Sequence, residues 1–207
     1  MTTINHIKRK QTGFSLIEVM VTIVVLSTGL LGIAALQMQS KHSNLIAAQR
    51  TLASHMVHDL LERMRANPKQ LNVYTPSDTD LVLLDSISNI PSQACTSNAA
   101  CDSTQLATHD IWQWSNALNG GLNLIGNDSV GSLLDAVACI GRPAGGGSGN
   151  YTVAVAWRST KAVNNPVISE NTTANNCGTT TGRYDQDNTG DNKLRHVYYI
   201  DSYIYTG

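Results

Sequence analysis

The side chain whose type and position most clearly imply chemistry is Glu18, the one charged residue in the apolar run from Phe14 to Leu36. A charged side chain at the centre of a membrane costs about 2.5–3.5 kcal/mol on insertion scales, so it usually has a partner. In an ordinary membrane anchor, Glu18 would reach the interface and pair with Lys10. Glu18 is therefore the first candidate for a functional residue.

The chain also has an even number of cysteines: Cys95, Cys101, Cys139 and Cys177. Behind an N-terminal segment of the exported type, this number predicts two disulfides in an oxidising compartment. Of the three possible pairings we favour Cys95–Cys101, because a short loop closes locally, which leaves Cys139–Cys177. Reduced thiols or a zinc site are the alternatives. We predict no metal, because no C-x-x-C pair is present.

Residues 185–191 resemble the beginning of a calcium loop, in which oxygen ligands alternate around a glycine turn. Thr189 replaces a carboxylate or amide ligand, however, and His196 stands where such a loop has glutamate. We favour a solvated loop tip and keep calcium as the alternative.

Two further sets of residues could form sites. A metal is conceivable on adjacent helical turns at His55, His58, Asp59 and Glu62. An aromatic platform for sugar is conceivable at Trp112 and Trp114. We favour an ordinary polar helix face for the first set and packing in the core or against another subunit for the second.

Composition and motifs argue against other functions. The net charge is −1, which gives no basic field for nucleic acid. The patterns G-x-S-x-G, G-x-x-x-x-G-K and G-x-G-x-x-G are absent from the sequence. We therefore predict neither an enzyme nor a cofactor.

The elements that position Glu18 begin with a basic leader. Residues 1–13 carry Lys8, Arg9 and Lys10 and no acidic residue. The apolar run that follows is long enough to span a hydrocarbon core of about 30 Å as a helix. The basic cluster predicts a cytoplasmic N-terminus, with everything after Leu36 outside. A signal peptide cleaved near Ala34 and Ala35 is the alternative, although Glu18 argues against it.

The helix is predicted to continue beyond the membrane to Ala66, about 50 residues in all. A stripe of apolar residues recurs at helical spacing, namely Ile46, Ala53, Val57, Leu60 and Met64, with Leu61 beside it. Arg63 and Arg65 suit the last turn, Asn67 can cap it and Pro68 ends it.

The second half of the chain predicts a small sheet. Residues 71–84 are ambiguous between loop and short strand, and residues 110–118 predict a short helix. Strands are predicted at residues 133–140, 151–157 and 197–205, and a polar loop at 158–194. Three or four antiparallel strands over the C-terminal half of a long helix give an α+β fold. We thus divide the chain into leader (1–13), membrane and assembly helix (14–36), amphipathic helix (37–68) and disulfide-containing head (69–207).

The segment Gly13-Phe14-Ser15-Leu16-Ile17-Glu18, between a basic leader and an apolar helix, resembles type IV pilins and the related pseudopilins of type II secretion. The continuations TGLLGIAALQMQ and HDLLERMRANP resemble the PilV-type minor pilins, also called type IV pilus modification proteins. The resemblance is close over residues 8–68 and looser beyond. Many major pilins have a proline near Ala34 and Ala35. Here Gly29 and Gly32 mark either the weakest part of the helix or a close helix contact.

The resemblance implies that a prepilin peptidase cuts between Gly13 and Phe14 and methylates the new amino group of Phe14. Glu18 of one subunit would then neutralise the amine of a neighbour and set the register between the two helices. The implied location is the inner membrane, single-pass with a periplasmic head, and later the pilus on the cell surface.

The implied function is that of a minor pilin, which helps to prime pilus assembly, with twitching motility and cell adhesion as its context. The implied partners are the prepilin peptidase, other minor pilins and the major pilin. Two alternatives stay open. One is a pseudopilin of type II secretion, and the other is a membrane-tethered binding module whose loops at 158–192 hold a ligand.

Overall fold

The computed structural model describes residues 13–75, 82–84, 91, 95, 100–120, 124–125, 128–129, 131–162, 171–185 and 190–207. The chain divides into two units, Met1–Leu45 and Ile46–Gly207, the second of which we call the globular unit. The division lies within a helix, so the boundary follows a change in packing and not a break in secondary structure.

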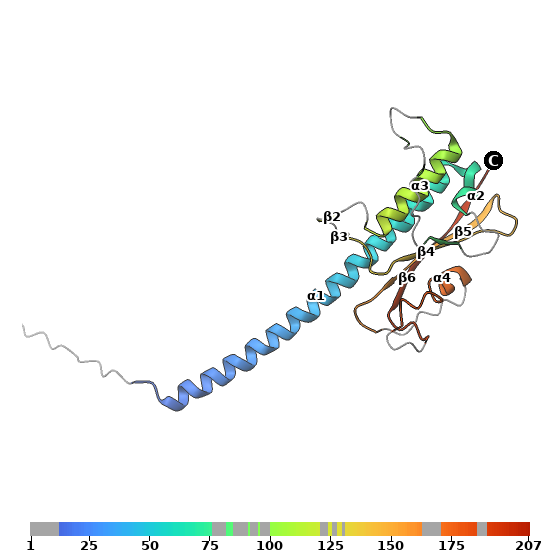
Figure 1. Cartoon of the computed structure of the whole chain (residues 1–207). Helices are drawn as coiled ribbons and strands as arrows, with labels where there is room; N and C mark the ends of the chain where they lie inside the picture. Colours follow the sequence, from blue (N-terminus) through green and yellow to red (C-terminus); the bar gives the residue numbers. More distant parts are fainter. Residues whose placement is uncertain are drawn as a thin grey trace, which may run out of the picture. The chain divides into compact units, whose positions relative to one another are not determined.

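The longest element is α1, Leu16–Ala66, with 51 residues (Figure 1). It confirms the predicted long helix. The predicted end is also correct, because Pro68 lacks the N–H that would continue the hydrogen-bonding ladder. The chain turns there into a 3-10 helix, Pro68–Gln70, and a short helix α2, Leu71–Tyr74. Residues 71–74 are therefore helical, where the sequence predicted loop or strand. The side chain of Asn67 does not cap either helix and instead donates to the Ser103 carbonyl oxygen at 2.6 Å.

The sheet has the strand order β1-β4-β5-β6, with each pair antiparallel. Its strands are β1 (Val82–Leu84), β4 (Val137–Gly141), β5 (Gly149–Arg158) and β6 (Arg195–Ile204). A separate two-stranded sheet joins β2 (Leu124–Ile125) to β3 (Asp128–Ser129). The α+β fold predicted from the sequence is therefore correct, and β5 and β6 pair without a break over their whole length.

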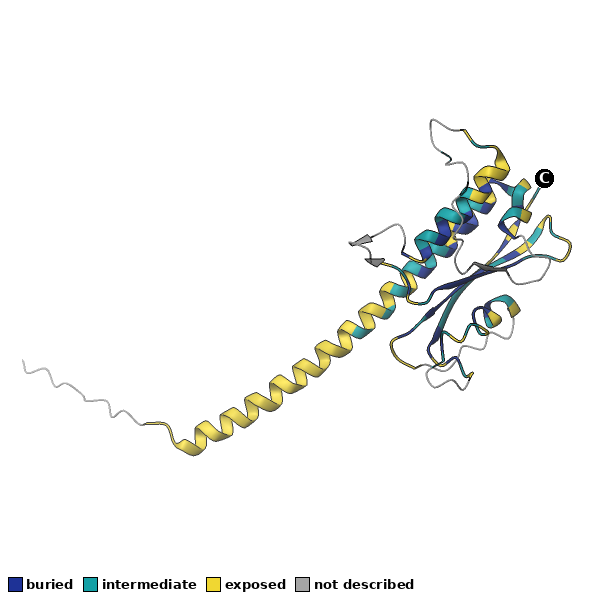
Figure 2. Cartoon of the chain, viewed as in Figure 1, coloured by how far each residue is buried: buried dark blue, intermediate teal, exposed yellow. Residues whose placement is uncertain are grey.

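The main core lies between the sheet and two helices of the globular unit. Buried side chains of α1 (Ala53, Val57, Leu60, Leu61 and Met64) meet those of α3 and of the inner face of the sheet. They form the blue stripe on α1 in Figure 2, whereas the helix of the N-terminal unit is exposed and yellow. The predicted apolar stripe is thus the face that packs on the sheet, with Ile46 only partly buried at its beginning.

The helix α3, Ser103–Leu118, is longer than the predicted segment 110–118. Its extra turns begin at a capping box, in which Asp102 accepts from the Gln105 backbone N–H and the Gln105 side chain accepts from the Asp102 N–H. Trp114 fastens α3 to α1, because its Nε1–H donates to the Met56 carbonyl oxygen at 2.8 Å.

The outer face of the sheet, away from α1, carries a second buried cluster. It joins β4 and β5 to α4, Thr172–Asn176, and consists of Val137, Cys139, Ala154, Ala156, Ala174, Cys177 and Tyr184. The short helix α4 lies inside the stretch 158–194 that the sequence predicted as polar loop. The sheet is therefore covered on both faces within the globular unit.

Candidate functional site

The junction between Gly13 and Phe14 precedes the first helical residue. Helix α1 begins at Leu16, and the carbonyl oxygen of Ser15 accepts from the N–H groups of Glu18 at 3.0 Å and Val19 at 3.3 Å. The side chain of Phe14 is 86% exposed. An exposed bond outside regular structure is the kind of site at which proteolysis concentrates. The junction is therefore accessible to a peptidase in the isolated chain.

Glu18 lies in the first turn of α1, where a carboxylate is stabilised by the positive end of the helix dipole. Its side chain is exposed. Within the described part of the chain, no ion-pair partner of Glu18 is found. Lys10, the partner expected in an ordinary anchor, lies outside the described residues. Glu18 is available to a cation that comes from outside the described chain.

Three hydroxyl groups that follow Glu18 in the apolar part of α1 are satisfied within the helix. Thr22 donates to the Val19 carbonyl oxygen at 2.8 Å, and Ser27 donates to that of Ile23 at 2.7 Å. Thr28 donates to the carbonyl oxygens of two residues in the preceding turn. These bonds leave Glu18 as the principal polar contact that this part of α1 offers to a neighbour.

The N-terminal part of α1 is long and apolar enough to cross a membrane. An 18-residue window has a mean hydropathy of 2.4, and none of that window is buried. A signal sequence near the N-terminus would meet the same criterion of length and composition. Gly29 and Gly32 are helical, and nothing lies within 4 Å of a Cβ placed on either. Side chains as apolar as these require lipid or other helices around them.

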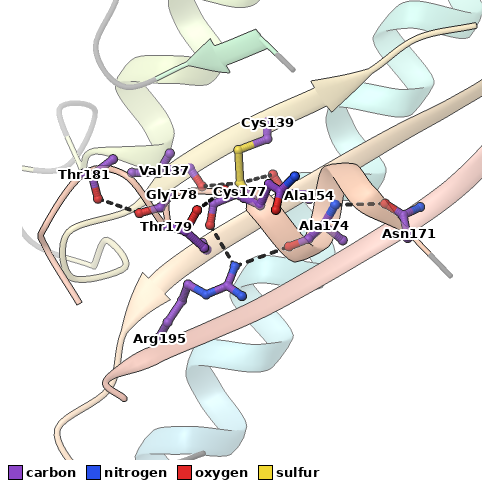
Figure 3. The surroundings of a disulfide bond; sticks show 12 residues. Val137, Cys139, Ala154, Asn171, Ala174, Cys177, Gly178, Thr179, Thr181 and Arg195 are labelled. Atoms are coloured by element: carbon purple, nitrogen blue, oxygen red, sulfur yellow. Dashed lines mark hydrogen bonds between the residues drawn. A yellow bond between two sulfur atoms is a disulfide. The ribbon is translucent and has the colours of Figure 1, made fainter. Parts of the chain in front are cut away.

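The structure pairs Cys95 with Cys101 and Cys139 with Cys177, which is the pairing that the sequence analysis favoured. The Cα atoms lie 5.5 Å and 5.7 Å apart, within the usual range for disulfides. Cys139 lies on β4, and Cys177 follows α4 directly (Figure 3). The second disulfide therefore fastens α4 to the outer face of the sheet.

Arg195 reinforces the same contact, and the sequence analysis did not predict it. This side chain is completely buried, and its Nη1 donates to the carbonyl oxygens of Ala174 at 3.3 Å and Cys177 at 2.9 Å (Figure 3). Burial lowers the pKa of Arg195. At the other end of α4, Asn171 accepts from the Ala174 N–H at 2.8 Å. The α4 segment is thus held at both ends.

A second polar network that sequence reasoning missed joins α1, α2 and α3. Asp110 accepts from Arg63 Nη1 at 3.1 Å and from the Tyr74 hydroxyl at 2.7 Å, and Arg63 also donates to Gln113 at 2.9 Å. Burial and the hydrogen bond to Asp110 raise the pKa of the Tyr74 hydroxyl. No sequence signal connects these residues, because each suits an exposed position on its own helix.

Two of the four candidate metal residues on α1, Asp59 and Glu62, have other partners. Asp59 pairs with Arg63 at 3.0 Å, and Glu62 pairs with Arg65. Among the described residues, no group of three or more histidine, cysteine, aspartate or glutamate side chains could hold a metal ion.

The other two candidate sites are the calcium-like segment at residues 185–191 and the pair Trp112 and Trp114. Residues 186–189 of the calcium-like segment lie outside the described residues. At its edges, Asp185 accepts from the Asn192 N–H at 2.8 Å, and Asp191 pairs with Lys193. Trp114 is buried, whereas Trp112 lies beside His109 with ring centroids 5.7 Å apart. The two tryptophans therefore do not form one platform.

Comparisons with known proteins match the first half of the chain. Residues 8–34 match the family model of the prokaryotic N-terminal methylation motif, and residues 35–112 match that of the type IV pilin Tt1218. The two matches adjoin and together cover about half of the chain. No curated protein and no solved structure matches the chain.

Proposed function

We propose that this chain, which carries a type IV pilin segment behind an N-terminal methylation motif, is a minor pilin. In this role it takes part in priming and assembling type IV pili, in a complex of minor pilins at the filament tip. The proposal gives the chain a structural role and no reaction of its own. Its partners are the prepilin peptidase, other minor pilins and the major pilin.

The observation that carries the proposal is the relation between the junction and Glu18. Hydrolysis of the Gly13–Phe14 bond, which precedes the helix, releases an amino group at Phe14. The carboxylate of Glu18, one turn into α1, has no ion-pair partner within the described residues. A charge brought into a water-poor helix bundle requires a partner. The methylated amine of Phe14 in one subunit and Glu18 in its neighbour meet that requirement for each other.

The same helix supports the proposed location. An apolar helix as exposed as the N-terminal part of α1 is stable in a membrane before assembly and among other helices afterwards. The proposed topology is single-pass in the inner membrane, with the globular unit in the periplasm. Two disulfides suit that oxidising compartment.

The direct test is mass spectrometry of the N-terminus of the membrane-extracted chain, from cells with and without prepilin peptidase. We expect a mature chain that begins at methylated Phe14 only when the peptidase is present. A Gly13→Ala variant should block cleavage, and Gly29→Ala serves as the control. A chain that begins at Met1 in both strains, or one cut near Ala35, would contradict the proposal.

A pseudopilin would have the same mature N-terminus, so a second experiment separates the two functions. Deletion of a minor pilin should reduce surface pili and twitching while leaving type II secretion intact. Loss of secreted enzymes with normal pili would assign the chain to the secretion system.

A further inference from the structure

Strand β6 forms an open edge of the sheet in the globular unit. It is the last strand in the order β1-β4-β5-β6, and its ten residues pair with β5 on one side. Along an edge strand, alternate backbone N–H and C=O groups point away from the neighbouring strand. Between His196 and Ile204, the backbone groups make no hydrogen bond to described residues other than those of β5. This edge therefore offers a row of donors and acceptors to another strand.

The two edges of the sheet differ in a way that singles out β6. The opposite edge strand, β1, has three residues, and short edge strands are one means by which proteins avoid unwanted pairing. Strand β6 has ten residues, contains neither lysine nor proline, and pairs with β5 without a bulge. Tyr203 near its end is 63% exposed. Apart from Asp201 and the buried Arg195, the β6 edge thus lacks the usual protections.

Asp201 gives the edge a charge preference. It is an exposed residue of β6, and its Oδ1 accepts from Asn171 Nδ2 at 2.7 Å and from Thr152. Its second oxygen has no partner among the described residues. A basic side chain opposite Asp201 on an added strand would stabilise the strand pairing, and an acidic one would destabilise it.

A second copy of this chain fits the edge poorly. Pairing with β1 of another copy offers the three residues that the structure describes as that strand. Parallel pairing of two β6 strands in register brings the two Asp201 side chains together. Antiparallel pairing reverses the helices, because β6 runs in the same direction as α1. Two contacts show this direction: Ser54 lies 3.2 Å from the Tyr198 hydroxyl, and Arg65, later in α1, lies 2.6 Å from Ser202, later in β6. Opposed helices do not suit subunits of one filament, a step that rests on the proposed function.

We propose that the β6 edge receives an extended strand from a different protein, with a basic side chain opposite Asp201. Backbone hydrogen bonds to β6 supply the affinity, and alternate side chains of the added strand continue the two faces of the sheet. On the proposed function, the donor is another component of the pilus tip. The inference deepens that function by naming a contact surface of the globular unit.

The experiment uses the isotope-labelled full chain in detergent micelles and measures amide hydrogen exchange along β6 by NMR. The probe is a synthetic peptide of alternating threonine and valine with one central lysine. One control peptide has glutamate in place of lysine, and another is N-methylated on alternate backbone nitrogens. We expect alternate β6 amides to exchange rapidly in the free chain and to slow by at least about tenfold with the lysine peptide. The N-methylated peptide should give no protection.

The charge preference is tested with a matched pair of variants. The lysine peptide should bind about threefold more tightly than the glutamate peptide. This difference should disappear in Asp201→Asn, which keeps the shape of the side chain, and persist in Asp59→Asn on α1.

Three results would overturn the proposal. Uniformly slow exchange along β6 in the free monomer would show that the chain covers its own edge. Equal binding of the N-methylated peptide would exclude strand addition. A dimer with protected β6 amides would assign the edge to a second copy. None of these results depends on cleavage at Gly13, so a failure of the minor-pilin proposal remains distinguishable.

Discussion

At the scale of single residues, Glu18 differs from the other carboxylates of α1. Asp59 and Glu62 have arginine partners on the same helix, so their charges are already balanced. Glu18 has no such partner in the described chain and lies in an exposed apolar surface. Its role is therefore decided by what surrounds the helix, which makes it the residue to substitute first.

We expect Glu18→Gln to reduce incorporation into filaments by at least about tenfold while leaving cleavage after Gly13 intact. A buried charge that loses its partner costs about 3–5 kcal/mol, and about 1.4 kcal/mol is a factor of ten in an equilibrium. Immunoblots of sheared pili, with mass spectrometry of the N-terminus, measure the two effects. Glu62→Gln, on the same helix, is the control and should assemble normally. Normal assembly of the Glu18→Gln variant would contradict the proposed pairing of Glu18 with the Phe14 amine of a neighbouring subunit.

His196 is the second residue with a testable charge. Its ring stacks on Trp157 with centroids 5.6 Å apart, and its Nε2 is buried without a partner in the described chain. Burial and the nearby Arg50 lower the pKa of His196 below its usual value near 6.5. The unfolded chain then binds the proton more readily than the folded chain does.

The stability of the globular unit should therefore be greatest above the pKa of the unfolded histidine and decrease as the pH falls towards the lower, folded value. Urea unfolding at several pH values between 7.5 and 5 measures the slope of the free energy of unfolding against pH. His196→Gln should flatten it, whereas His55→Gln, on an exposed part of α1, should not. An equal slope in all three proteins would contradict the assignment.

At the scale of elements, the Cys139–Cys177 disulfide contributes more to the stability of the fold than the Cys95–Cys101 disulfide does. It closes a longer loop, with a sequence separation of 38 residues against 6. It also holds α4 against the outer face of the sheet together with Arg195. The Cys95–Cys101 disulfide closes a local loop before α3.

Replacement of Cys139 and Cys177 by serine should lower the free energy of unfolding by up to about 4 kcal/mol, because the unfolded chain regains the entropy of the open loop. The matched Cys95→Ser and Cys101→Ser pair should cost about 2 kcal/mol. Chemical denaturation of both variants beside the parent chain measures the difference. A larger loss in the second pair would contradict this ranking.

At the scale of the whole molecule, stability resides in the globular unit. The buried hydrophobic residues of the described chain run from Ala53 to Ile204, all within Ile46–Gly207. The N-terminal unit contributes a helix with an exposed surface. The two units therefore differ: the globular unit holds the buried core, and the N-terminal unit presents an exposed apolar helix.

A chain that begins at Ile46 should consequently keep a single cooperative unfolding transition, with a free energy of unfolding within about 1 kcal/mol of the full chain. It should also dissolve without detergent. Circular dichroism during urea titration, with the full chain in micelles as reference, measures the effect. Loss of cooperative unfolding would show that the N-terminal unit supports the core.

The sequence predicted the features that depend on periodicity. The spacing from Ala53 to Met64 identified the buried face of α1, and runs of valine, alanine and aromatic residues identified β4, β5 and β6. It did not predict the start of α3, because the capping box at Asp102 lies within polar residues that also suit a loop. Arg195 was missed because its partners are carbonyl oxygens about twenty residues earlier in the chain. Such contacts depend on tertiary structure and leave no local pattern.

The internal hydrogen bonds of the Thr22, Ser27 and Thr28 hydroxyl groups affect how easily α1 moves from one apolar environment to another. With these groups bonded to the helix backbone, the surface of this part of α1 is about as apolar as the acyl chains of a bilayer. The helix can therefore move between lipid and a bundle of other helices at little net cost in free energy. On the proposed function, withdrawal of a subunit into the membrane is then opposed mainly by the loss of the ion pair between Glu18 and the amine of Phe14 in a neighbouring subunit.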